Sequence, residues 1–310
     1  APWARPGVGG AMSGSDDLRV VDVDDAHADT FLRYAREFGA VHDDSYVTDE
    51  DLAAFDPVSE PAVMVLDGTE VPLGAASVML RGYETEGLGR FRILHAGDAP
   101  TYVRLLDAVL ARVPAHISRV FVFMPESPGE AGDALAQAGF AESRRAYVML
   151  HSSPAHVMEP ELPSETTLEL AHPTAAIDWA NVVNMAFRGE PGRYDMTPDR
   201  AAELLGRPRV IRSGTLMACR GGRPAGLVMT VADEDDVYGA EIETLAVLPA
   251  DQHVGLGRAL LREALRAAGR EGRSSVSLSV STSNKRALAL YLDAGFGVHD
   301  VRVCWDLRRS

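Results

Sequence analysis

The stretch at residues 240–265, AEIETLAVLPADQHVGLGRALLREAL, decides the fold of this chain. An apolar strand ends at Leu248-Pro249, a short polar loop follows, and a helix rich in Arg, Ala and Leu starts directly after the glycines. Glycines between a strand and a helix let the backbone approach a ligand closely, and the helix N-terminus directs several N–H groups and a partial positive charge at one anion. The stretch therefore predicts a site for a phosphate or pyrophosphate.

The loop lacks the marks of the two commonest nucleotide motifs. No Lys-Ser or Lys-Thr follows the glycines, as a P-loop requires, and the dinucleotide fingerprint GxGxxG is missing. The run QHVGLG at 252–257 instead resembles the Q/R-x-x-G-x-G/A motif of the GNAT acyltransferase superfamily. That resemblance implies a loop that holds the pyrophosphate of acetyl-CoA.

A second pattern supports the same family. Asn284, Ala287, Tyr291 and Gly295-Phe296 resemble N-x-x-A-x-x-x-Y-x-x-x-G-F, with which the superfamily usually finishes its fold. The strand before the loop also has the expected form, since an acidic residue near its start precedes an apolar run. The resemblance implies an acetyl-CoA-dependent N-acetyltransferase acting on the amine of a small molecule.

Three short similarities indicate that the chain contains two copies of one α/β unit. Segments starting at 18, 72 and 135 resemble segments starting at 168, 224 and 290, in the same order and at offsets of about 150 to 156 residues. We therefore predict a disordered leader at 1–15, a first GNAT-like domain at 16–151, a linker at 152–164 and a second domain at 165–310.

The expected elements of the second copy predict its architecture. Antiparallel strands are expected where apolar runs alternate with turn signals, and the strand–helix–strand unit at 240–281 requires a parallel neighbour. The fold class is α/β, with each domain a mixed, mainly antiparallel twisted sheet flanked by helices. The expected strands are 166–171, 214–220, 225–232, 237–247, 275–281 and 298–308, and the expected helices are 174–187, 198–206, 256–271 and 284–294.

The first copy differs where the second carries its glycines. Residues 91–100 contain a single glycine and Asp98 two residues before a proline, which is the signature of a helix start with Asp98 as N-cap. A carboxylate there repels a pyrophosphate. The first domain is interpreted as a degenerate half, and the alternative is cofactor binding through an altered loop.

The resemblance assigns roles to the residues of the second copy. The loop amides hold the pyrophosphate, the end of the strand pairs with the pantetheine arm, and a backbone N–H of Leu245 or Ala246 polarises the thioester carbonyl. Asn284 either binds the cofactor arm or caps its helix. The predicted cofactor-binding residues are Leu245, Ala246, Val247, Gln252, His253, Val254, Gly255, Leu256, Gly257, Arg258, Ala259 and Asn284.

Direct attack of an amine on a thioester needs a base and an acid. Glu241 and Glu243 are the candidates for the base, because residues two apart on a strand share a face. Glu241 comes first, since it lies eleven positions before Gln252, where many family members carry a glutamate. The alternative is that either one is a solvated charge. Tyr291 is the candidate acid, and its alternative is a core tyrosine.

Composition excludes several classes of protein. A net charge of −15 argues against a nucleic-acid partner, and no apolar stretch approaches the ~20 residues of a membrane span. The first eleven residues have no apolar core and are not expected to be a signal peptide. Two cysteines provide no disulfide framework, which indicates the cytoplasm, and the histidines form no close metal-ligand pair. Arginine supplies nearly all the positive charge, as in a GC-rich genome such as an actinomycete's.

These features favour a soluble N-acetyltransferase, monomeric or homodimeric, that needs no metal. Its second domain carries the activity. The alternative from a different class is an acyl-CoA-binding or sensor protein that has lost its chemistry and keeps the first domain as a scaffold. The pocket for the acceptor amine is built by loops and helices that vary within the superfamily, so the sequence does not name the acceptor.

Overall fold

The computed structural model describes residues 18–42, 47–80, 83, 87–189, 195–233 and 238–309. The chain forms two compact units, of which the first lies wholly in the first half of the sequence and the second takes segments from both halves. The first unit comprises the described parts of Ala1–Arg81, Gly89–His116 and Gly129–Phe140, and the second those of Gly82–Leu88, Ile117–Pro128 and Ala141–Ser310. The predicted leader lies outside the described residues.

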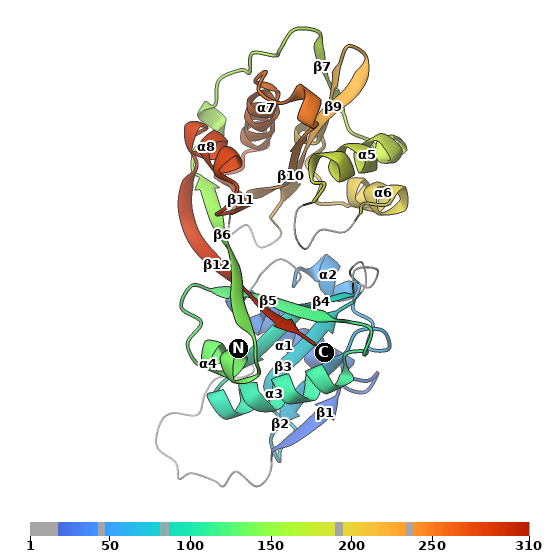
Figure 1. The fold of residues 1–310 in the computed structure, drawn as a ribbon, viewed down its shortest axis with the longest axis vertical. Helices are drawn as coiled ribbons and strands as arrows, with labels where there is room; N and C mark the ends of the chain where they lie inside the picture. Colours follow the sequence, from blue (N-terminus) through green and yellow to red (C-terminus); the bar gives the residue numbers. More distant parts are fainter. Residues whose placement is uncertain are drawn as a thin grey trace. The chain divides into compact units, whose positions relative to one another are not determined.

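The first unit is an antiparallel sheet in the order β1-β2-β3-β4 with helices on both faces (Figure 1). Helices α1 and α2 cover one face through a cluster that includes Phe31 and Leu52, while α3 packs on β2 and β3 from the other. The bounds are β1 Arg19–Asp22, α1 Ala28–Phe38, α2 Asp49–Ala53, β2 Ala62–Leu66, β3 Pro72–Met79, β4 Leu88–Ala96, α3 Ala99–Arg112 and α4 Glu130–Gln137.

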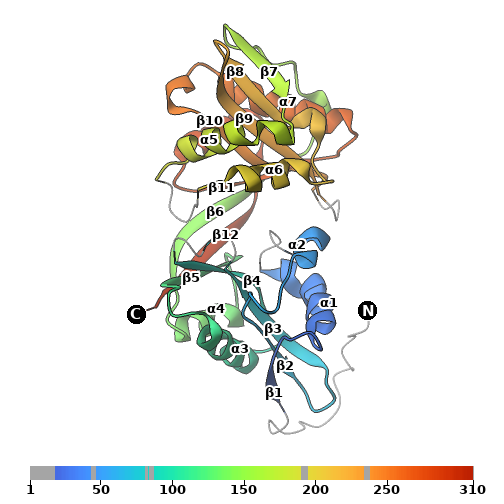
Figure 2. The same ribbon diagram turned by 90° about the vertical axis from the view of Figure 1, so that its right-hand side faces the viewer.

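The second unit contains the strands in the order β5-β12-β6-β11-β10-β9-β8-β7, in which β10 and β11 are parallel and the other named pairs are antiparallel. Figure 2 shows α5 and α6 on one side of β8–β10 and α7 on the other. The bounds are β5 Arg119–Pro125, β6 Ala141–His151, β7 Thr166–Leu170, α5 Ala176–Ala186, α6 Pro198–Gly206, β8 Leu216–Arg220, β9 Arg223–Ala232, β10 Ala240–Val247, α7 Leu256–Arg270, β11 Val276–Ser281, α8 Lys285–Asp293 and β12 Gly297–Arg308.

The order of elements repeats along the chain, which confirms the predicted α/β class with tandem copies. From β1 to β6 and again from β7 to β12, a strand is followed by two helices, three strands, a helix, a strand, a helix and a last strand. The expected strands and helices of the second copy are all present, with ends that differ by at most three residues. The parallel pair β10–β11 is the neighbour that the strand–helix–strand unit required.

The last strands of the two copies are exchanged (Figure 1, green and red). Strand β6, which ends the first copy, pairs with β11 of the second, and β12, which ends the second copy, pairs with β5 of the first. The two exchanged strands also pair with each other along most of their lengths. The packing units are therefore not continuous segments, and the boundaries predicted at 151 and 165 remain a prediction about the sequence repeat.

The face of the sheet that carries α7 and α8 has the largest apolar cluster around the predicted site. The cluster joins the buried side of α7 to β10, β11 and Met149 of β6. The helix is strongly amphipathic, since its leucines and alanines recur at helical spacing. Across the described ranges, no helix is long and apolar enough to cross a membrane.

Candidate active site

A buried carboxylate anchors the loop between β10 and α7. Asp251 ends the short 3₁₀ turn Pro249–Asp251 and is fully buried. Arg223 of β9 donates two hydrogen bonds to it, at 2.8 and 3.0 Å, and Arg220 of β8 lies at 3.3 Å. Burial alone raises the pKa of Asp251, but the hydrogen bonds from Arg223 and Arg220 outweigh it, so the pKa lies below its usual value. The loop thus starts from a fixed point.

After this anchor the backbone turns so that the N-terminus of α7 is open. Gly255 is the N-cap with φ of 93°, no side chain caps the helix, and His253 also has a positive φ of 66°. A Cβ on Gly255 meets nothing within 4 Å, so the backbone conformation alone demands glycine there. Within the described residues we find no acceptor for the N–H groups of Leu256, Gly257 and Arg258. Such a terminus suits an anion.

Side chains tie this loop to its neighbours. The Gln252 side-chain amide donates to the Val247 carbonyl at 3.0 Å and accepts a hydrogen bond from Arg286 of α8. The Arg258 guanidinium contacts Asp293 of α8 at 2.6 Å. Of the predicted loop residues, Val254 is exposed and Ala259 is buried under the helix. The loop residues thus offer their backbone N–H groups, while Gln252 and Arg258 direct their side chains to the protein.

Strands β10 and β11 are paired only at the start of β10 and stay apart up to the end that leads into this loop. They pair at only two positions, Ala240 with Val276 and Glu241 with Ser277. Beyond Glu241 the described part of β10 pairs with β9 alone, up to its last residue. The predicted pantetheine-binding residues 245–247 lie in this part, with the middle one buried toward α5 and α6 and its neighbours packed toward α7. From Ile242 onward, the edge of β10 on the side of β11 is therefore not paired with another strand.

The two candidate bases lie beside a β-bulge. The register of β10 against β9 shifts between Ile242 and Thr244, which interrupts the regular alternation that predicted a shared face for Glu241 and Glu243. The Glu243 carboxylate is hydrogen-bonded by Arg209 and lies 3.4 Å from Arg207. All three side chains of this group are at least four-fifths buried. Two guanidinium groups therefore already engage the Glu243 oxygen.

Asn284 and Tyr291 lie on α8 in different environments. The Asn284 side chain is the N-cap of α8 and accepts a hydrogen bond from the Ala287 N–H at 3.0 Å. Capping, one of the two predicted roles of Asn284, is therefore present. Tyr291 is 8% exposed and joins the α7 cluster, with its ring 5.9 Å from that of Phe296.

Several arginines that contact the site carried no signal in the sequence. Arg207 and Arg209 follow α6, Arg223 opens β9, and Arg286 lies in the first turn of α8. Their roles depend on carboxylate and amide partners that are distant in the sequence, 28 to 36 residues away. Asp251 had a local signal, since it directly precedes the glycine motif.

The corresponding helix of the first unit, α3, has its N-terminus capped by the side chain of the residue that precedes it. Asp98 is the N-cap of α3, and its carboxylate accepts a hydrogen bond from the Thr101 N–H at 2.9 Å. This confirms the prediction of Asp98 as N-cap. The two equivalent helices therefore begin differently, with a carboxylate on α3 and with unpaired N–H groups on α7.

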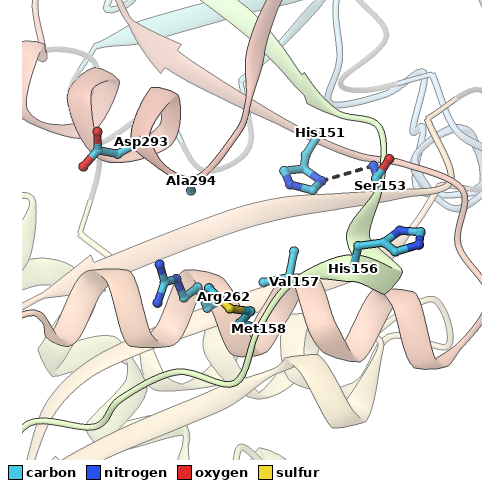
Figure 3. A pocket seen from close by; sticks show the side chains of 8 residues that line it. All are labelled: His151, Ser153, His156, Val157, Met158, Arg262, Asp293 and Ala294. Atoms are coloured by element: carbon cyan, nitrogen blue, oxygen red, sulfur yellow. Dashed lines mark hydrogen bonds between the residues drawn. The ribbon is translucent and has the colours of Figure 1, made fainter.

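A separate cavity of about 300 Å³ lies between α7, the end of α8 and the segment after β6 (Figure 3). His151 lines one side of the cavity, and its ring is held in place because Nδ1 accepts a hydrogen bond from the Ser153 N–H at 3.3 Å. Burial lowers the pKa of His151, and a backbone hydrogen bond at Ala294 offsets this in part. The lining residues are His151, Ser153, His156, Val157, Met158, Arg262, Asp293 and Ala294. None of the predicted site residues is among them.

Neither thiol nor metal chemistry is apparent in the described ranges. The thiols of Cys219 and Cys304 are free, and burial raises the pKa of Cys304 to about 12. No group of three or more His, Cys, Asp or Glu side chains in the described part of the chain is placed to hold a metal ion.

Comparison with known proteins identifies the family. The Acetyltransferase (GNAT) family matches residues 179–296, which include the whole loop and α8. A mycothiol acetyltransferase of Clavibacter michiganensis subsp. michiganensis is 32% identical over 272 residues, which cover 81% of each chain. The chain belongs to the GNAT acetyltransferase family. It is an acetyltransferase, and enzymes of this family use acetyl-CoA.

Further similarities extend over most of the chain. A mycothiol acetyltransferase of Streptomyces avermitilis is 28% identical over 81% of this GNAT protein and 92% of its own length. A solved tandem GNAT protein from the clavulanic acid biosynthesis pathway superposes with a TM-score of 0.70 at 15% identity, covering 94% of this chain and 98% of that one. The second likeness shows the tandem fold alone. The curated relatives named here are actinobacterial, as the arginine-rich composition suggested.

Proposed function

We propose that this GNAT protein transfers the acetyl group of acetyl-CoA to the amine of a small molecule, and that the second unit performs the reaction. The observation that carries the proposal is the open N-terminus of α7 beside the part of β10 that β11 leaves unpaired. One end of that arrangement suits a pyrophosphate and the other suits an extended amide chain. The two ends are joined by the loop that Asp251 anchors.

The loop amides of residues 254–258 bind the pyrophosphate in this proposal, whereas the predicted contribution of Ala259 is ruled out because its N–H already donates to the Gly255 carbonyl at 3.0 Å. Their N–H groups point along the axis of α7, where the helix dipole adds to the attraction for negative charge. Amides held by a folded backbone need no reorganisation on binding. This is why the position of the loop matters, and why its ties to β10 and α8 belong to the binding apparatus.

The strand supplies the groups around the thioester. A backbone N–H of Leu245 or Ala246 polarises the carbonyl, so that the negative charge formed on its oxygen is stabilised as the amine attacks. Glu241 accepts the proton that the ammonium loses. We favour it over Glu243, because it lies eleven positions before Gln252, where the family pattern carries its glutamate. The Glu243 carboxylate is held by Arg207 and Arg209.

Tyr291 returns a proton to the departing thiolate of CoA. Its position on α8, the helix that follows α7 and β11, is the position that the family pattern predicts. The helix that carries it is tied to the loop through the contact of Arg286 with Gln252. A buried phenol gives the proton to a forming thiolate with little competition from water.

The acceptor is a small molecule with a primary amine. The relatives of Clavibacter and Streptomyces are named mycothiol acetyltransferases, and the length and tandem layout of this chain also resemble mycothiol synthase. We therefore place a cysteinyl-glucosaminyl-inositol amine first in the panel of acceptors. Other amines, such as an antibiotic intermediate or an aminoglycoside, complete the panel.

The test measures thiol release from acetyl-CoA over this panel. Glu241→Gln and Tyr291→Phe are each expected to lower kcat by about 10²- to 10⁴-fold, with little change in the KM for acetyl-CoA. Glu243→Gln is the matched control on the same strand. It is expected to lower the free energy of unfolding, because two guanidinium groups lose their carboxylate, while kcat changes by less than about tenfold.

A binding protein without chemistry is the competing function, and the burial of Tyr291 within the apolar cluster is the observation that favours it. In that case acetyl-CoA binds and no amine of the panel yields turnover. Turnover that survives both Glu241→Gln and Tyr291→Phe would instead show that the base and acid are misassigned. The two results separate loss of function from an error in the mechanism.

A further inference from the structure

Two glycines show how the two units correspond. A Cβ on Gly74 of β3 would lie 2.9 Å from the His95 carbonyl oxygen, and one on Gly226 of β9 would lie 2.8 Å from the Ala246 carbonyl oxygen. Each would also meet two side chains one helical turn apart on the covering helix, at 101 and 105 of α3 and at 260 and 256 of α7. Gly74 and Gly226 are therefore equivalent positions.

The strand registers extend this equivalence to the cofactor strand. Gly74 pairs with Ala96 of β4, and Ala76 pairs with Leu94. In the second unit Gly226 pairs with Val247 of β10, and the residue two further along β9 pairs with Leu245. Leu94 of the first unit thus corresponds to Leu245 of the second. Leu245 is one of the two residues whose N–H we propose to polarise the thioester carbonyl.

The N–H of Leu94 already has a partner from its own unit. It donates a hydrogen bond to Nε2 of His42 at 3.1 Å, and the His42 side chain is 1% exposed. Because an imidazole nitrogen that accepts carries no proton, this nitrogen presents a lone pair to the strand as a carbonyl oxygen would. The donor and acceptor are both buried, so the hydrogen bond is not shared with water.

In the first unit, the position equivalent to the open N-terminus of α7 is also occupied by a side chain of the protein. The Asp98 carboxylate accepts the hydrogen bond from the first turn of α3, where the open N–H groups of α7 lie in the second unit. The His42 side chain therefore pairs with the strand amide of Leu94, and the Asp98 side chain pairs with the helix amide of Thr101. His42 thus presents a lone pair where the thioester oxygen of an acyl-CoA would lie, and Asp98 presents lone pairs where its phosphates would lie.

We infer that His42 and Asp98 are internal substitutes for acyl-CoA in the first unit, so that the chain binds one acetyl-CoA, at the second unit only. This inference rests on the proposed function, because that function assigns the role of the Leu245 N–H. It gives the first unit a folded state that is complete without a ligand. It also assigns to His42 a role that no motif in the sequence marks.

Two measurements on the full chain test the inference. Titration calorimetry with acetyl-CoA is expected to give a stoichiometry of one. Hydrogen exchange is expected to slow over residues 252–259 on adding acetyl-CoA and to stay unchanged over 91–101. A stoichiometry of two, or protection over 91–101, would overturn the inference.

Variants of His42 test the hydrogen bond itself. His42→Ala is expected to speed amide exchange at Leu94 by about tenfold, the effect of losing one buried hydrogen bond. His42→Gln keeps an acceptor at the reach of Nε2 and is expected to retain most of the protection, which separates loss of the acceptor from a general loss of folding. Equal exchange in the wild type and His42→Ala would refute the role of His42. If no acetyl-CoA binds at all, the proposed function fails, and this exchange experiment still decides whether His42 occupies the strand.

Discussion

Replacing Gly226 by alanine perturbs the cofactor strand without changing any side chain that we propose to act in catalysis. The new Cβ would lie 2.8 Å from the Ala246 carbonyl oxygen and 3.2 Å from Cδ1 of Leu260, so β9 must move away from β10 and α7 by roughly half an ångström to reach ordinary contact. Overpacking of this kind costs about 1–3 kcal/mol of unfolding free energy. Because Ala246 and its neighbour carry the N–H groups proposed to bind the thioester, we also expect the KM for acetyl-CoA to rise roughly tenfold.

Gly74→Ala is the matched control, because the first unit repeats the same geometry. Its Cβ would lie 2.9 Å from both the His95 carbonyl oxygen and Cδ1 of Leu105. We expect a similar loss of stability, again about 1–3 kcal/mol, but an unchanged KM for acetyl-CoA. The pair of variants thus separates the cost of the extra methyl group from its effect on the cofactor strand.

The assay combines urea unfolding with the initial rate of thiol release at varied acetyl-CoA. The expected pattern is two destabilised proteins of which only Gly226→Ala binds acetyl-CoA weakly. An equal rise in KM for Gly74→Ala would refute the assignment of the cofactor strand to β10. Unchanged stability in both variants would refute the packing argument.

Three further predictions concern the loop and the buried ionisable groups. Gly255→Ala is expected to cost about 1–2 kcal/mol in urea unfolding because of its positive φ, whereas Gly257→Ala, whose Cβ makes ordinary contacts at 3.6 Å, is expected to be neutral or to stabilise α7 by up to about 1 kcal/mol. Asp251→Asn is expected to lower the unfolding free energy by about 2 kcal/mol at pH 7. Because the folded pKa of Asp251 is lowered, this contribution is complete above the unfolded value near 3.8 and is lost as the pH falls through the folded pKa, so equal acid profiles of the two proteins would contradict it. Burial lowers the pKa of His95 to about 4, so the stability of the wild type is expected to decline as the pH falls from about 6.5 to 4. A His95→Phe variant that keeps the same slope would show that another group is responsible.

The fold was predictable because its signals are local. Hydrophobic periodicity and turn residues located every element of the second copy. Asp98 was recognised as an N-cap because it lies two residues before a proline at a helix start. The open loop was predictable for the same reason. Gly255 marks a positive φ, and a strand, a loop and a helix that are adjacent in sequence form the anion site with little help from the rest of the chain.

The candidate bases show where this reasoning stops. Glu241 and Glu243 look alike in a strand pattern of period two, but the bulge between Ile242 and Thr244 breaks that period. Arg207 and Arg209, which a distant loop brings to Glu243, were not foreseen from that pattern. A partner 34 or 36 residues away leaves no trace in local spacing.

The sequence by itself determined the family, the repeated order of elements and the loop that opens α7, because each depends on the conformational preferences of neighbouring residues. Only the tertiary structure decided which strands β6 and β12 pair with, that Asp251 anchors the loop through Arg223, and that the Leu94 N–H donates to His42. The physical reason is the same in each case. A hydrogen bond or ion pair between distant segments is specified by where the fold brings those segments together, and local spacing in the sequence carries no record of it.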